Sequence, residues 1–187
     1  MKRVFLTSSL LLLATASPAL AHTGHAVAND FSTGFLHPFF GLDHILAMIG
    51  VGLLATQYEG KLKMVLPATF VAVMALGGFL GLSAMQVPFM EQGILASVIL
   101  LGAILAFGKK LPLIASGALV AIFALFHGAA HGVEMPLAST FAVYGAGMMV
   151  ASTLLHAAGV AFGYAAPFMI RYAGAGFALV GMGLAAA

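Results

Sequence analysis

Charged side chains are almost absent from this chain, and this scarcity limits its fold more than any other feature. The 187 residues include only seven Lys and Arg and five Asp and Glu, which is 6% of the chain. Soluble domains carry roughly 25% charged residues. The composition therefore excludes a soluble globular enzyme and a disordered chain. A net charge of +2 with no basic cluster also excludes a nucleic-acid-binding surface.

The first 21 residues have the pattern of a secretory signal peptide. Lys2 and Arg3 precede the apolar run Val4–Ala14, and Ala19–Ala21 forms a small-x-small cleavage site. We therefore expect cleavage after this triplet, so that the mature chain begins at His22 outside the cytoplasmic membrane of a bacterium. The alternative is an uncleaved first transmembrane helix.

Six apolar segments follow, and most are near the ~20 residues that cross a hydrocarbon core of roughly 30 Å. They are approximately Gly34–Thr56, Met64–Leu82, Phe89–Phe107, Leu111–Ala130, Pro136–Phe162 and Pro167–Ala186. The loops are too short for a second domain. The sequence thus predicts an all-α integral membrane protein. Its domains are a signal peptide (1–21), an outer His-containing segment (22–33) and a compact bundle of six transmembrane helices (34–187).

The charged residues agree with this topology. If His22 lies outside, every basic residue of the mature chain lies on the cytoplasmic side, as the positive-inside rule requires. These residues are Lys61, Lys63, Lys109, Lys110 and Arg171. The outer carboxylates are then Asp30, Glu91 and Glu134, and Glu59 is the exception. An uncleaved signal helix would leave these loops on the same sides, so the charges do not decide the question of cleavage.

Glycines recur at the small-xxx-small spacing that allows helix backbones to approach closely in lipid. The pairs are Gly77 with Gly81, Gly128 with Gly132, and Gly159 with Gly163. We expect them at helix contacts.

A polar motif, His37-Pro38-Phe39-Phe40-Gly41-Leu42-Asp43-His44, lies inside the first apolar segment. In one continuous helix, His37 and His44 would lie about two turns apart and face the same way. An unpaired Asp43 in lipid would cost roughly 3 kcal/mol or more. We therefore expect Asp43 to face the bundle interior, with a histidine, a metal ion or water as its partner.

The fourth segment ends in a second polar group. His127, His131 and Glu134 follow the spacing i, i+4, i+7, which places them on one face if the helix continues. We expect His37 to meet His131 and Glu134 near the outer mouth. Deeper in the bundle, we expect Asp43, His44 and His127. His156, nearer the cytoplasm, would be a further metal-binding position on one pathway across the membrane.

Histidine and carboxylate ligands without cysteine favour borderline divalent ions, namely nickel, cobalt, zinc or copper(II). The mature His22, with its free amine, and His25 would add an outer capture site. These groups bind metal only when neutral, so uptake should weaken at acid pH. Simpler interpretations remain: His22 and His25 are a tail, Glu134 is a solvated loop acid, and His156 is a hydrogen-bonded core histidine.

The motif from His37 to His44, followed by Met48, resembles the HPxxGxDHxxxM signature of the HupE/UreJ family. The similarity covers the whole mature chain, and the segment His127–Glu134 is similar to the family's second histidine-containing region. The resemblance implies a small bacterial secondary permease for nickel, sometimes cobalt, linked indirectly to hydrogenase or urease maturation. It also implies that His37, Asp43 and His44 act in metal transport, and that Pro38 and Gly41 determine the local backbone shape.

The expected function is therefore import of a divalent metal, most simply nickel, through a path lined by His and Asp. No prosthetic group is expected. The expected partners are the metal ion and the bilayer, and a homo-oligomer is left open. No phosphate-binding GxxxxGK[ST] loop occurs, so the energy must come from the membrane potential, a coupled ion or trapping. The alternatives are a membrane metal sensor or scaffold, a membrane metalloenzyme, and a proton-conducting chain of His and Asp residues. A metalloenzyme would need more His boxes than this chain has.

Overall fold

All regular structure is helical in the part of the chain that the structure, a computed structural model, describes (residues 30–83 and 87–187). The α-helices are α2 (Asp30–Leu36), α3 (Leu42–Ala55), α4 (Val65–Leu82), α5 (Met90–Phe107), α6 (Leu113–Glu134), α7 (Phe141–Ala165) and α8 (Ile170–Ala185). Three short 3-10 helices join them: η2 (His37–Phe39), η3 (Gly60–Met64) and η4 (Pro167–Met169). The all-α prediction is confirmed at this level. The expected signal peptide, His22 and His25 lie outside the described residues.

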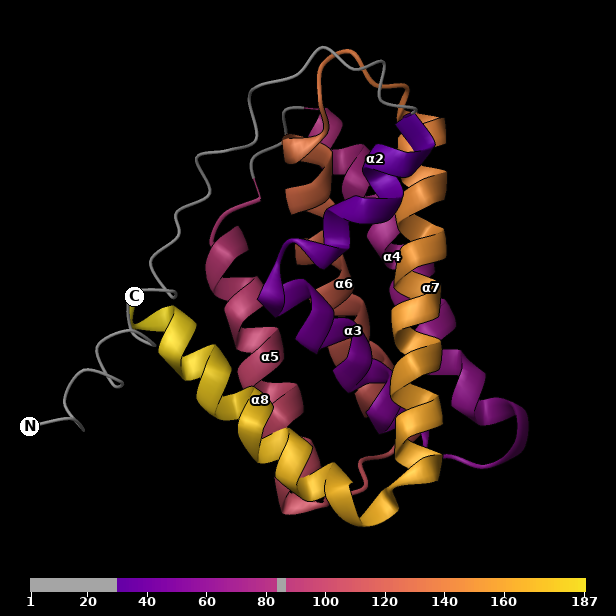
Figure 1. Cartoon of the computed structure of the whole chain (residues 1–187), viewed down its shortest axis with the longest axis vertical. Coiled ribbons are helices and arrows are strands. Elements are labelled where there is room, and N and C mark those ends of the chain that lie inside the picture. Colours follow the sequence, from indigo (N-terminus) through magenta and orange to yellow (C-terminus); the bar gives the residue numbers. More distant parts are fainter. Residues whose placement is uncertain (1–29, 84–86) are drawn as a thin grey trace, which may run out of the picture.

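Five helices are long and apolar enough to cross a membrane, and a bent pair of helices makes a sixth candidate. The chain is thus a multi-pass helical membrane protein. The bent pair, Asp30–Phe39 with Leu42–Ala55, turns through 81° (Figure 1). The prediction of one continuous first helix is therefore wrong. Pro38 cannot donate a backbone hydrogen bond, and Gly41 is extended with φ −104° and ψ 116°, so the helical ladder stops between them.

The fourth and fifth predicted segments also change their limits. α6 continues through Glu134, one turn beyond the expected end at Ala130. α7 begins only at Phe141, because Pro136 lies in the connection that precedes it. Its first turn is capped from another helix: the backbone N–H of Thr140 donates to a carboxylate oxygen of Asp30 at 2.7 Å. This contact ties the start of α2 to the start of α7.

Glycines bring helix backbones into direct contact, as their spacing predicts. A Cβ added to Gly77 would lie 3.1 Å from the Cα of Gly128, and a Cβ added to Gly81 would lie 3.1 Å from the Cα of Gly132. α4 and α6 therefore pack backbone to backbone. Gly159 of α7 likewise meets the backbone of α3. A larger side chain at these positions would separate the helices.

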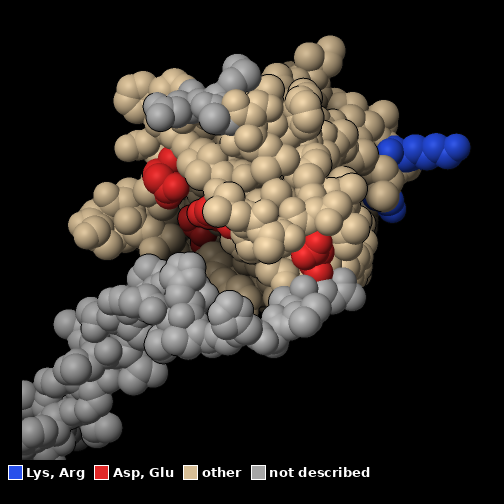
Figure 2. All heavy atoms as spheres, turned by 90° about the horizontal axis from the view of Figure 1, so that it is seen from above, with Lys and Arg blue, Asp and Glu red and all other residues tan. Residues whose placement is uncertain are grey.

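The two ends of the bundle differ in charge. We call the end that carries Asp30, Glu91 and Glu134 the carboxylate end; Figure 2 looks onto it and shows acidic groups on this face, with basic groups only at its margin. The opposite, basic end carries all the Lys and Arg of the described residues, on the connections that follow α3 and α5 and in the first turn of α8. Arg171 there donates to the last carbonyls of α5. The predicted separation of charge along the bundle is found in the structure.

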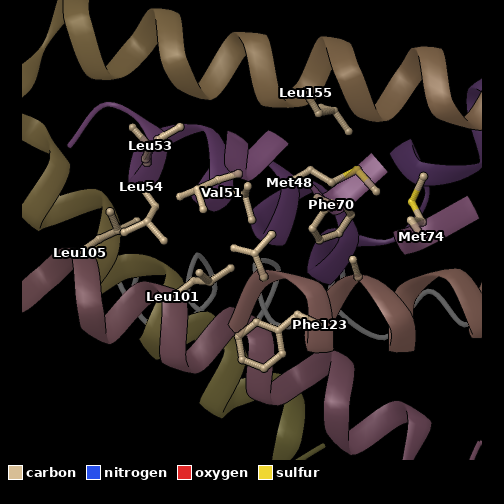
Figure 3. Close-up of a cluster of buried hydrophobic side chains, with 14 of the residues drawn as sticks. Met48, Val51, Leu53, Leu54, Phe70, Met74, Leu101, Leu105, Phe123 and Leu155 are labelled. Atoms are coloured by element: carbon tan, nitrogen blue, oxygen red, sulfur yellow. The ribbon is translucent and has the colours of Figure 1, made fainter. Parts of the chain in front are cut away.

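The buried apolar core fills the space between α3, α4, α5, α6 and α7 (Figure 3). Met48, Leu54, Phe70 and Leu101 are fully or almost fully buried in it. α8 contacts mainly α5 and leaves most of its surface exposed. The core thus holds α3 and its histidine in the centre of the bundle.

Candidate metal site

The break in the first span determines where its two histidines point. His37 lies in η2, and His44 lies in the first turn of α3 on the other side of the bend. The sequence predicts that the two histidines share one face of a single helix, and this prediction is wrong. Both side chains nevertheless reach α6. The ring centre of His131 lies 5.0 Å from that of His37 and 4.5 Å from that of His44. The bend places the two rings around one histidine.

His37, His131 and Glu134 form a compact outer triad at the carboxylate end. One ligand atom from each lies within 4.8 Å of the others. The His37 Nε2 and Glu134 Oε2 atoms are 2.9 Å apart, and His131 Nδ1 lies 4.0 Å from the same oxygen. The triad is graded in exposure, from 47% for the Glu134 side chain through 27% for His37 to 2% for His131. An ion arriving from water would thus meet the carboxylate first and the buried imidazole last.

Asp43 is paired with its neighbour His44, as expected for a carboxylate in an apolar segment. The Asp43 Oδ1 atom accepts hydrogen bonds from His44 Nδ1 and from the His44 backbone N–H, both at 2.8 Å. A proton held on Nδ1 leaves the lone pair on Nε2, which is buried without a hydrogen-bond partner. A carboxylate behind the imidazole is the usual support of a metal-binding histidine. Gly41 leaves room for the pair, because a Cβ there would lie 2.8 Å from Asp43 Oδ1.

The backbone of its own helix orients the His127 imidazole in the same way. Its Nδ1 donates to the carbonyl oxygen of Phe123 at 2.9 Å, and its Nε2 is buried without a partner. The rings of His44 and His127 are 5.1 Å apart. The expected deeper pairing of these residues is therefore found, although whether they bind metal stays a prediction.

Four imidazoles thus form one continuous row, which we call the histidine row: His37, His131, His44 and His127. Buried polar atoms without partners typically cost about 1–3 kcal/mol each. Three of these four rings carry a buried nitrogen that has no hydrogen-bond partner in residues 30–83 and 87–187. A ligand that accepts several nitrogen lone pairs at once, such as a divalent cation, would satisfy them together. The remaining predicted residue, His156, is buried on α7 and is not in ring contact with the row.

Two aromatic residues next to the row were not predicted. The Tyr144 ring lies 5.9 Å from that of His37, and its buried hydroxyl has no hydrogen-bond partner in the described part of the chain. Tyr144, His131 and several methionines line a cavity of about 90 Å³, which is enough for several water molecules. The other residue, Phe70, contacts His127 at 5.5 Å between ring centres. No motif or spacing links either aromatic residue to a histidine that lies so far away in the sequence.

The comparisons with known proteins agree with the sequence resemblance. The family model described as "HupE / UreJ protein" matches residues 10–185. The curated Protein HupE of Rhizobium leguminosarum bv. viciae is 41% identical over 189 residues, and the match covers 98% of each chain. No solved structure matches this chain.

Proposed function

We propose that this chain, which belongs to the HupE/UreJ family, is a secondary transporter that imports a divalent transition metal, with nickel as its main substrate. We place it in the cytoplasmic membrane of a bacterium, with the carboxylate end outside and the basic end inside. This orientation follows the positive-inside rule. The metal would pass along the histidine row between α3, α6 and α7.

The observation that carries the proposal is the row of buried imidazoles that starts at a solvent-exposed carboxylate. Glu134 and His37 would take an ion from water, and His131 would draw it into the bundle. The Nε2 atoms of His44 and His127 would receive it next, because their Nδ1 atoms are already committed to hydrogen bonds. Each step exchanges one imidazole for the next at ring spacings of 4.5–5.1 Å.

The ligand set favours a borderline divalent transition metal over harder ions, and the preference for nickel among these metals comes from the resemblance to the family. Imidazole suits nickel, copper and zinc, whereas calcium and magnesium prefer a cage of oxygens. The described part of the row offers the carboxylates of Asp43 and Glu134 beside its four imidazoles. Since the sequence has no phosphate-binding loop, the energy for uptake would come from the membrane potential, a coupled ion or trapping of the metal inside. A potential of about 100 mV assists a divalent ion by about 4.6 kcal/mol, at about 2.3 kcal/mol for each charge.

The test is metal uptake by the purified protein in liposomes that contain a nickel-sensitive dye. Nickel, cobalt, zinc and copper are added in turn to the wild-type protein and to His44→Ala. The proposal predicts nickel uptake that this substitution abolishes. Metal binding without uptake, in vesicles shown to contain folded and oriented protein, would instead support a sensor or a scaffold. Current without added metal would support proton conduction.

A further inference from the structure

The histidine row ends at an aromatic ring. Phe70 of α4 contacts both His127 and His156, with ring centres 5.5 Å and 4.9 Å away. Phe70 is fully buried. Its ring offers no atom that can bind a cation strongly in place of an imidazole nitrogen. A metal ion that moves from His127 to His156 would therefore have to pass next to this ring.

His156 has the same unsatisfied chemistry as the deep part of the row. Its exposure is 1%, and its Nε2 atom has no hydrogen-bond partner among the described residues. α7, which carries His156, packs closely against α3. Gly52 of α3 allows this approach, because a Cβ at Gly52 would collide with the carbonyl oxygen of His156. A buried imidazole nitrogen without a partner is costly unless a ligand reaches it. His156 can thus bind a metal ion, which would have to pass Phe70 to reach it from His127.

We propose that Phe70 is a gate that divides the pathway into an outer compartment, the histidine row, and an inner metal-binding compartment at His156. The proposal rests on the transport function proposed above. An ion moves inward when the phenyl ring turns aside. Figure 3 shows Met48 and Met74 near Phe70 in the same buried cluster. Methionine side chains are flexible and fill irregular space, so they can follow the movement of the ring.

The first test measures access to each compartment without using transport. The chain contains no cysteine, so His131→Cys and His156→Cys each introduce one unique thiol into the full-length protein. Membrane vesicles with the carboxylate end outward receive a small, charged methanethiosulfonate reagent that cannot cross the bilayer. We expect the thiol of His131→Cys to react, because this position lines the cavity that Tyr144 shares, and the thiol of His156→Cys to react at least about tenfold more slowly.

Opening the gate should expose the inner thiol. Adding Phe70→Ala to His156→Cys should raise its modification rate about tenfold. Phe177→Ala is the matched control, because Phe177 of α8 packs against the same buried cluster but makes no ring contact with a histidine among the described residues. Equal rates for the two single-cysteine proteins would overturn the proposal. So would an unchanged rate in the Phe70→Ala protein, or a His131→Cys thiol that does not react.

A size series gives the second test. In liposomes, Phe70→Leu should speed nickel uptake, whereas the larger ring of Phe70→Trp should slow it about tenfold. Nickel affinity in detergent should not change in either variant, because the outer ligands remain. A ring that only packs would give Phe70→Leu and Phe177→Leu the same uptake rate, which would overturn the gate. If the wild-type protein moves no metal, the proposed transport function fails, and the thiol reactions still decide whether Phe70 separates the compartments.

Discussion

Asp43→Asn should weaken nickel binding while it preserves the shape of the site. In the native chain, Asp43 Oδ1 accepts the Nδ1–H of His44 at 2.8 Å and so keeps the Nε2 lone pair free for a metal. The asparagine amide has nearly the same outline but no charge. Its oxygen is a weaker acceptor, and its NH₂ group can instead donate to Nδ1, which would move the proton to Nε2. Either arrangement makes His44 a poorer ligand.

The magnitude follows from the geometry of the pair. Loss of a group that orients a metal-binding histidine typically costs about 10–100-fold in affinity. This range corresponds to about 1.4–2.8 kcal/mol. The Asp43 side chain is 21% exposed, so water can replace part of the lost interaction. We therefore expect a loss in the lower half of the range, about 10–30-fold.

Isothermal titration calorimetry of the detergent-solubilised protein measures the nickel affinity. Glu91→Gln is the control, because it removes one carboxylate from the same end of the bundle without touching a histidine in the described contacts. Thermal unfolding checks that both variants are folded. An Asp43→Asn protein that folds and binds nickel as tightly as the wild type would refute the role assigned to the pair.

Three further predictions use other parts of the structure. Glu134→Gln removes the charge from the outer triad and should weaken nickel binding about tenfold, again by calorimetry; unchanged affinity would exclude Glu134 as a ligand. Gly81→Val drives a side chain into the carbonyl of Ala129 and should destabilise the protein by about 1–3 kcal/mol. It should therefore unfold at a lower temperature than Gly117→Ala, whose Cβ meets nothing, and equal unfolding temperatures would contradict the packing described for α4 and α6. Protons compete with metal for imidazole and carboxylate, so nickel affinity should fall steadily from neutral pH to about pH 5; a flat profile would argue against these ligands.

The spans, the charge asymmetry and the glycine contacts could be predicted because each follows from local composition or spacing. The two polar groups could also be placed at matching depths, since α6 does continue to Glu134. The bend in the first span could not be predicted in the same way. A proline early in an apolar segment is compatible with an ordinary helix start. The bend also depends on contacts distant in sequence, such as that between Asp30 and Thr140.

The aromatic neighbours of the histidine row were missed for a different reason. In a soluble helix, an apolar stripe marks the face that is buried. Membrane helices are apolar on nearly every face, so the sequence of α4 does not show that Phe70 points inward while Phe79 is 58% exposed. Tyr144 gives no clearer signal. Only the packing of α4 against α6, and of α7 against α2 and α3, brings these rings to the histidines.

Whether the histidine row holds nickel is tested most directly by X-ray absorption at the nickel edge of the loaded, full-length protein. We predict a first shell that contains several imidazole nitrogens, with fewer imidazoles in His131→Ala, because His131 touches both His37 and His44. Leu119→Ala, a substitution elsewhere on the same helix, should leave the spectrum unchanged. A first shell made only of oxygen atoms, identical in the wild-type protein and in His131→Ala, would contradict metal binding by this row.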